Sequence, residues 1–397
     1  KIILYNNMNY NKKYKNEVDK IVKIIEEDTD KPKNMSFKEK NIFNILYEDL
    51  KNGIDLSHIL YENNKIKLDI EENDNSVPSG GFIDKTISDY ISNTNKKVYK
   101  YTVDLLGRKI IIKFYLFNKE NEQYLIRGLK NIISWLIVCS KYSSIKCNKI
   151  LEIDIYLTDK EKKFPNEKGK ILGPINLNTG YSGVCLPDNQ IVIYRKEEWF
   201  KVFIHETFHA YEFQPDSVND ELLLEGIKSE IEGINADISI TEMYVEVWAR
   251  IINSCYSSIY NSNNFNEFLS ILSFNLRVES IFSIIQSIRV LDYMDLNFED
   301  IVKKNKLFLK NNYKEETNVF SYIILSSVVL NNSYNFVSWC YKNNLNIFKF
   351  DNSREKVKLF VDLIKTDFKN KKTRTMYKTL NNSKNMEIGL RFSIINI

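Results

Sequence analysis

The sequence is sparing with the residues that usually mark a special class of protein. Its 397 residues include 12 glycines, 6 prolines, 3 histidines and 5 cysteines, which are Cys139, Cys147, Cys185, Cys255 and Cys340. The cysteines are odd in number, widely spaced and without a CxxC pair, which argues against a disulfide framework and against a cysteine zinc site. This usage fits a reducing compartment, so we expect a cytoplasmic protein.

The chain also lacks an excess of charge and long hydrophobic runs. Its 56 Lys+Arg and 52 Asp+Glu leave a net charge of +4, which is too small to indicate a nucleic-acid partner. The longest apolar runs, around Ile132 to Cys139 and Tyr322 to Leu330, are shorter than the roughly 20 residues of a membrane span. The first stretch, KIILYNNMNYNKK, has too short an apolar core for a signal peptide. We therefore predict neither a nucleic-acid partner nor a membrane span.

What the chain does contain is enough apolar material for a folded protein. Its composition is 43% hydrophobic over 46.9 kDa, which suits two to three domains, and its richness in Asn, Lys, Ile and Tyr suggests AT-rich coding. Changes of character along the chain predict four parts. These are a polar, helical N-terminal segment (1–95), a core of mixed strands and helices (96–260), a helical C-terminal domain (261–368) and a loosely packed polar tail (369–397).

The hydrophobic periodicity predicts a hairpin, a helix and two strands before a second helix that carries the motif below. Amphipathic helices are expected near Lys13–Glu27 and Phe37–Lys51, and EENDNSVPSGG (71–81) is typical of a flexible loop. In the predicted core, the expected elements are a hairpin turning at Leu106-Gly107 (97–117), a helix (121–143), strands (151–159 and 190–195) and a helix from Glu197. Acidic residues in the first turn of that helix would suit its dipole. Residues 219–260 and most of 267–364 are expected to be helical, and EIGLRFSII could add a short strand.

Two of the three histidines stand close together. His205 and His209 are four residues apart in HETFH, an instance of the HExxH pattern, and only His58 lies elsewhere. Residues four apart share a helix face, so both imidazoles can bind one zinc ion at about 2.0–2.1 Å. Glu206 lies beside them and can take a proton from zinc-bound water, whose pKa the metal lowers towards about 7. We expect a catalytic zinc site; the alternative is two surface histidines on an ordinary amphipathic helix.

A zinc site of this kind needs a third protein ligand. The following stretch, AYEFQPDSVND, contains no histidine, which favours a carboxylate. In SITEMYVEVWARII (239–252), Glu242, Glu246 and Arg250 form a stripe at spacing four. We expect Glu242 to bind the metal and Glu246 to accept the other ring N–H of a ligating histidine. Glu225 is the main rival for the third ligand and Glu246 the next, and a solvated Glu246–Arg250 pair is the simple structural alternative.

HETFHA, followed by a helix with TEMYVEVWA, resembles the zincin metallopeptidases whose third zinc ligand is a glutamate, the thermolysin-like gluzincin branch. In that family an acidic residue four positions after the ligand orients a histidine, and Glu242 with Glu246 matches it, although the relatives usually have Asp at the second position. The resemblance covers roughly residues 97 to 260. It implies an α+β fold, with a zincin-like core of a twisted mixed sheet and an active-site helix, followed by a helical C-terminal domain.

The resemblance implies zinc-dependent hydrolysis of peptide bonds in a peptide or protein substrate. His205, His209 and Glu242 would hold one zinc ion, and Glu206 would be the general base. By the same analogy, the strand Gln190–Arg195 would be the edge strand that pairs with the substrate. Through NLNTGYSG and IVIYRKEEWFKVFIHE, the chain also resembles uncharacterised zincin-like proteins encoded by large DNA viruses. The alternatives are a non-catalytic structural or interaction protein on a zincin scaffold, such as a virion component, and a zinc hydrolase acting on another bond.

Two roles stay open at the level of sequence. The first is the group that stabilises the oxyanion, for which the candidates are Tyr181, Tyr211, Tyr244, Tyr293 and Arg250. The second is latency, because Cys185 in SGVCLPD could cap the zinc ion. A lone cysteine in an irregular loop is more often an ordinary half-buried thiol.

Overall fold

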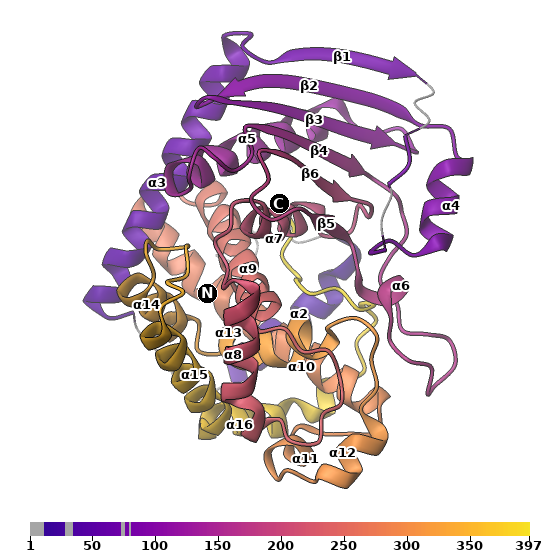
Figure 1. Cartoon of the computed structure of the whole chain (residues 1–397), viewed down its shortest axis with the longest axis vertical. Coiled ribbons are helices and arrows are strands. Elements are labelled where there is room, and N and C mark those ends of the chain that lie inside the picture. The colour runs from indigo at the N-terminus through magenta and orange to yellow at the C-terminus, as the bar shows by residue number, and fades with distance from the viewer. Residues whose placement is uncertain (1–11, 28–34, 73–75, 79–80) are drawn as a thin grey trace. The chain divides into compact units, whose positions relative to one another are not determined.

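The computed structural model describes residues 12–27, 35–72, 76–78 and 81–397, which form an α+β protein with a six-stranded mixed sheet and a helical C-terminal region (Figure 1). The chain divides into two compact units. The sheet unit consists of Asn44–Lys162 and Asn178–Phe213, and the helical unit of Lys1–Phe43, Lys163–Leu177 and Gln214–Ile397. These boundaries differ from the four predicted ranges, because the chain leaves the sheet unit once and returns to it before the motif helix.

The sheet unit is built on strands in the order β1-β2-β3-β4-β6-β5. Its strands are β1 (Lys67–Glu72), β2 (Lys97–Leu105), β3 (Arg108–Leu116), β4 (Ile150–Tyr156), β5 (Gly180–Ser182) and β6 (Asp188–Ile193). Its helices are most of α3 (Phe37–Glu62), with α4 (Lys85–Asn93), α5 (Glu122–Tyr142) and α7 (Trp199–Ala210). β3, β4 and β6 are parallel, and the pairs at both ends of the sheet are antiparallel.

The predicted hairpin is present as β2 and β3. Leu105 pairs with Arg108, so the turn contains only Leu106 and Gly107, with φ angles of 49° and 79°. Two left-handed residues give a turn whose twist matches that of the flanking strands. Glycine adopts this conformation without strain, and the exposed side chain of Leu106 is accommodated in solvent.

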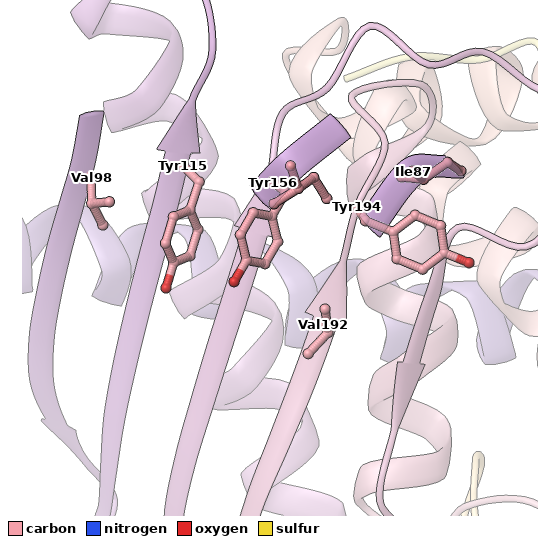
Figure 2. Close-up of a cluster of buried hydrophobic side chains, with 7 residues drawn as sticks. Ile87, Val98, Tyr115, Tyr156, Val192 and Tyr194 are labelled. Carbon is pink, nitrogen blue, oxygen red and sulfur yellow. The ribbon is translucent and has the colours of Figure 1, made fainter. Parts of the chain in front are cut away.

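The two faces of the sheet are covered by different helices, because neighbouring residues of a strand point to opposite faces. On one face, Phe114 of β3 packs edge-on against Trp199 of α7, with ring centroids 5.9 Å apart. On the other face, the rings of Tyr115 and Tyr156 stack with centroids 4.0 Å apart (Figure 2). The buried cluster on this second face consists of Ile87 and Ile91 of α4 with Val98, Tyr115, Tyr156, Val192 and Tyr194.

The edge of the sheet is not where the resemblance placed it. The predicted edge strand at 190–195 corresponds to β6, which lies between β4 and β5. The edge is β5, a three-residue strand that pairs with the last residues of β6, from Gly180↔Ile193 to Ser182↔Ile191. A three-residue strand in a glycine-containing loop is too short to produce a periodic signal, which is why the prediction missed it.

The helical unit contains all the remaining elements. They are η1 (Lys12–Tyr14), α2 (Lys15–Glu27), α6 (Pro174–Leu177), α8 (Ser217–Ile227), η2 (Lys228–Glu230), α9 (Ile240–Tyr260), α10 (Phe265–Tyr293), α11 (Phe298–Val302), α12 (Lys306–Asn312), η3 (Phe320–Leu325), α13 (Ser326–Leu330), α14 (Ser333–Asn343), α15 (Arg354–Lys369), α16 (Lys371–Leu380) and η4 (Asn381–Ser383). By length and composition, α10 is the one helix in the described part of the chain that could cross a membrane, but 83% of its most apolar window is buried. Burial of this kind is typical of a core helix.

The last part of the chain is packed more tightly than predicted. It forms α16 and then an irregular segment in which Ile388, Leu390 and Ile394 are fully buried, and no named strand covers EIGLRFSII. The backbone N–H groups of Ile394 and Ile395 donate to Oε1 of the buried Glu279, at 3.0 Å each. These bonds satisfy an irregular backbone that has neither helical nor strand periodicity, so the expectation of a loose tail is wrong.

The first 95 residues contain more structure than the predicted helices. α2 and α3 confirm the helices expected near Lys13–Glu27 and Phe37–Lys51, whereas β1 and α4 were not predicted. The expected flexible loop (71–81) begins with the end of β1, and its residues 73–75 and 79–80 lie outside the described residues, as do the first eleven residues examined for a signal peptide.

Candidate metal centre

The motif helix α7 begins at Trp199, two residues later than predicted, so no acidic residue lies in its first turn. Glu198 precedes the helix with a left-handed φ of 57°. Its carboxylate pairs with the Lys162 ammonium at 2.7 Å, and both side chains are fully buried. Burial lowers the pKa of Lys162, and the Glu198 carboxylate acts in the opposite direction. Glu198 therefore anchors the start of α7 through a buried ion pair, and not through the helix dipole.

α7 is held on the sheet by contacts with α5. The Trp135 indole N–H donates to the Thr207 hydroxyl at 2.6 Å, and the Trp135 ring stacks on Phe208. Gly128 allows the close approach of Trp199, since a Cβ at this position would lie 3.1 Å from its ring. One side of α7 is thus fixed by aromatic packing, which restricts the directions in which the histidines can point.

His205 and His209 converge through their Nε2 atoms. These atoms are 3.3 Å apart, and the two rings are steeply inclined at 63°. Two nitrogens that bind one tetrahedral zinc ion at about 2.0–2.1 Å are themselves about 3.3 Å apart. The spacing therefore fits two ligands of one ion, and it also suits one imidazole donating to the other. His205 is 7% exposed and His209 is half-buried, so the pair is shielded but not enclosed.

Glu206 is held from the edge strand of the sheet. The Ser182 hydroxyl of β5 is 3.0 Å from the Glu206 carboxylate Oε2 and equally far from the Glu206 backbone oxygen, so it can donate to either. Gly180 makes this approach possible, because a Cβ there would lie 2.8 Å from the Val192 oxygen and 3.2 Å from Glu206 Oε1. Glu206 is only 6% exposed, so its carboxylate is fixed beside the histidines by a neutral donor.

The end of α7 is tied to a disulfide. Cys147 and Cys185 are bonded, with Cα atoms 4.4 Å apart, and Cys139, Cys255 and Cys340 are free and buried. The Cys185 N–H and the Asn148 side-chain amide both donate to the Ala210 carbonyl, the last of α7. The expectation that the cysteines form no disulfide is wrong, because pairing across 38 residues depends on the fold. The argument from cysteine usage for a reducing compartment is lost with it, and Cys185 is not a thiol that could cap a metal ion.

α9 carries the predicted third ligand at its start. The backbone N–H of Glu242 donates to the Ser239 hydroxyl at the N-cap, and the Glu242 side chain is half-buried. One turn later, Glu246 Oε1 accepts a hydrogen bond from Arg250 Nε at 2.8 Å. Both side chains are 1% exposed, so this is a buried ion pair and not the solvated pair considered from sequence.

The remaining candidates lie in ordinary surroundings. Glu225 is exposed on α8 and pairs with Lys228 at 3.0 Å. His58 is on α3, where its Nδ1 is 3.4 Å from the Lys130 ammonium. Of the tyrosines, Tyr211 and Tyr244 are buried in the core, and burial raises the pKa of both hydroxyls. The Arg250 guanidinium also contacts the Ser283 hydroxyl and the Tyr322 carbonyl.

Sequence reasoning did not place Gly180 and Ser182 of β5 beside Glu206. Ser182 and Gly180 belong to NTGYSG, whose glycine and serine appeared to be ordinary loop residues. Only the pairing of β5 with β6 brings them beside α7. A comparison with protein-family models, curated proteins and solved structures finds no match for this chain, so its function has to be argued from these residues.

Proposed function

We propose that this protein is a zinc-dependent metallopeptidase with a zincin-like core. The observation that carries the proposal is the convergence of the His205 and His209 Nε2 atoms at 3.3 Å beside the buried Glu206. A helix that only packs against a sheet has no need for an acidic residue between two converging imidazoles. The HExxH pattern combines two metal-binding histidines with a glutamate that can act as general base, which are the groups that metal-assisted hydrolysis needs.

Glu242 is the proposed third ligand. Its half-buried carboxylate lies at the start of α9, and the chain has only one histidine, His58, besides the two of the motif. Two histidines and one carboxylate are a ligand set of catalytic zinc sites, which keep a further position open. Glu246 is proposed to orient a ligating histidine, while its Oε1 accepts a hydrogen bond from Arg250.

The proposed roles of the zinc ion, Glu206 and Ser182 follow from the chemistry of their atoms. A zinc ion held by these residues would supply Lewis acidity for a peptide carbonyl and a water molecule. Glu206 accepts the proton of the attacking water on its carboxylate and returns a proton to the nitrogen of the leaving amine. Ser182 helps to hold this carboxylate in place, because its hydroxyl lies 3.0 Å from Glu206 Oε2.

The substrate is proposed to be an extended peptide that adds to the free edge of β5. β5 takes the place that the resemblance assigned to 190–195, because β6 has strands on both sides. Main-chain hydrogen bonds to an edge strand hold a peptide without regard to its sequence. Since Ser182 on this strand contacts Glu206, a peptide pairing with β5 passes close to the general base.

The decisive experiment measures zinc content by elemental mass spectrometry together with hydrolysis of a mixed peptide library. We expect one zinc ion per chain in the wild type and in Glu206→Gln, with the hydrolysis rate of Glu206→Gln reduced about a thousandfold. His205→Ala should lose both zinc and activity, and Glu242→Ala should lower zinc affinity. Glu225→Gln, at an exposed carboxylate on α8, is the matched control and should change neither quantity.

Two outcomes would overturn the proposal in different ways. A wild-type chain that binds no zinc after reconstitution would leave the imidazole pair as a hydrogen-bonded pair. A wild-type chain that keeps zinc but hydrolyses no peptide would favour a non-catalytic protein on the same scaffold or a different zinc chemistry. A Glu206→Gln variant that hydrolyses peptides as fast as the wild type would have the same meaning.

A further inference from the structure

An exposed aromatic pair lies on the edge strand beside the proposed site. Phe82 is 62% exposed, yet its ring stacks on Tyr181 of β5 with centroids 6.1 Å apart. The Phe82 backbone is fixed as well, because its carbonyl accepts a hydrogen bond from the buried Tyr194 hydroxyl at 3.0 Å. A large apolar ring is therefore exposed to solvent next to β5, a position typical of a surface that binds a partner.

The hydrogen-bond phase of β5 determines which of its backbone groups face the free edge. The Thr179 carbonyl accepts from Tyr194 N at 2.9 Å. Hydrogen-bonded pairs alternate in an antiparallel ladder, so Tyr181 exchanges its bonds with Val192, two residues further along. The N–H and C=O groups of Gly180 and Ser182 consequently point away from β6, towards the position of an added strand.

The two edges of the sheet differ in charge. β1, at the far edge, carries Lys67, Asp69, Glu71 and Glu72 in six residues. Charged side chains on an edge strand discourage pairing with another chain. β5 is short but has no charged residue, and its sequence is Gly-Tyr-Ser. Of the two edges, β5 is thus the one that an extended peptide can approach without displacing charges.

We propose that Phe82 and Tyr181 form a subsite for a large apolar or aromatic side chain of a peptide that pairs with β5. This inference rests on the proposed function. On an added strand, side chains alternate between the face of Ser182, which carries Glu206, and the face of Tyr181, which carries Phe82. A side chain one position away from a residue facing Glu206 therefore lies against the aromatic pair, where ring contacts favour apolar and aromatic groups.

The test measures binding without cleavage, on the full chain carrying Glu206→Gln. Fluorescein-labelled ten-residue peptides of alanine, threonine and lysine each carry one phenylalanine, moved through every position, and their Kd values are measured by fluorescence anisotropy. We expect about tenfold tighter binding with phenylalanine at one position or at positions two apart. Adding Phe82→Ala should abolish this preference, whereas adding Phe82→Leu should keep part of it.

Phe37→Ala is the matched control, because Phe37 is 81% exposed and belongs to the helical unit. It should leave the preference unchanged. A preference that survives Phe82→Ala, or no preference at any position, would overturn the subsite. So would self-association of the chain that Phe82→Ala abolishes, because a second copy would then occupy the pair.

Failure of the subsite and failure of the proposed function give different results. If the wild type hydrolyses peptides without a preference that depends on Phe82, the subsite alone is wrong. If the wild type binds no zinc and hydrolyses nothing, while the Phe82-dependent preference persists, the subsite stands on a peptide-binding edge and the catalytic proposal is wrong.

Discussion

α7 and α9 each carry a glutamate of the proposed site, and the two carboxylates are held by different kinds of donor. Glu206 on α7 is contacted by the neutral Ser182 hydroxyl at 3.0 Å. Glu246 on α9 is contacted by the Arg250 guanidinium at 2.8 Å, and both side chains of this pair are buried. A carboxylate that pairs with a guanidinium must give up that pair to take a proton, whereas one held by a hydroxyl need not. Within the proposed function, this difference suits Glu206 for proton transfer and Glu246 for a fixed, orienting charge.

The largest expected effect tests the guanidinium side of this comparison. Arg250→Met removes the charged partner of Glu246 together with bonds to Ser283 and the Tyr322 carbonyl. We expect the free energy of unfolding, measured by urea denaturation, to fall by about 3–5 kcal/mol, because the buried Glu246 carboxylate loses its guanidinium partner. Lys228→Met breaks an exposed pair with Glu225 and should cost less than about 1 kcal/mol. Equal losses in the two variants would remove the contrast.

A second prediction concerns how much a buried carboxylate lowers the free energy of unfolding when neutral groups supply its closest hydrogen bonds. Asp154 of β4 accepts from Gln190 Nε2 and the Tyr115 hydroxyl, while the Lys113 ammonium is 3.9 Å away. Burial, followed by the Glu152 charge, raises its pKa from 3.8 to about 6. Between about pH 4 and pH 6 the folded chain keeps a proton that the unfolded chain has lost, so stability falls as the pH rises through this window.

Asp154→Asn removes this dependence. Relative to the wild type, its free energy of unfolding should rise by on the order of 2–3 kcal/mol from pH 4 to pH 7. Urea denaturation of both proteins at pH 4 and pH 7 measures how the difference between their free energies of unfolding changes with pH. A pH-independent difference would mean that nearby Lys113 neutralises the carboxylate, as Arg250 does for Glu246.

The smallest expected effect tests the hydroxyl side. Ser182→Ala should lower the rate of peptide hydrolysis about tenfold, equivalent to about 1.4 kcal/mol, because the Glu206 carboxylate loses a positioning bond. Zinc content and the free energy of unfolding should stay close to those of the wild type. Ser182→Thr keeps the hydroxyl and should recover most of the rate. If alanine and threonine behave alike, the hydroxyl does not position Glu206.

The sequence predicted the helix around the motif well, because it is a single periodic element. HETFH is one helical turn in a chain with three histidines, so its spacing was visible without a fold. The hairpin turning at Leu106-Gly107 and the helix now seen as α5 followed from periodicity in the same way.

What the sequence could not predict depends on contacts between distant segments. β5 is too short for a period, and its position at the edge follows only from its pairing with β6. The sequence spacing placed Glu242, Glu246 and Arg250 on one face of a helix. The burial of the Glu246–Arg250 pair could not be predicted, because it depends on the helices packed around α9. The buried segment near Ile394 is irregular and is satisfied by one distant glutamate, Glu279.

The Cys147–Cys185 bond makes a covalent ring, and the excursion Lys163–Leu177 into the helical unit lies within that ring. Lys168 and Lys170 in this excursion have well-exposed side chains, so a protease can reach them. A chain nicked there would keep its two pieces joined through sulfur, with the first four strands on one piece and α7 on the other. It would migrate as one species on a non-reducing gel and as two after reduction, so an intact band would not prove an uncut backbone.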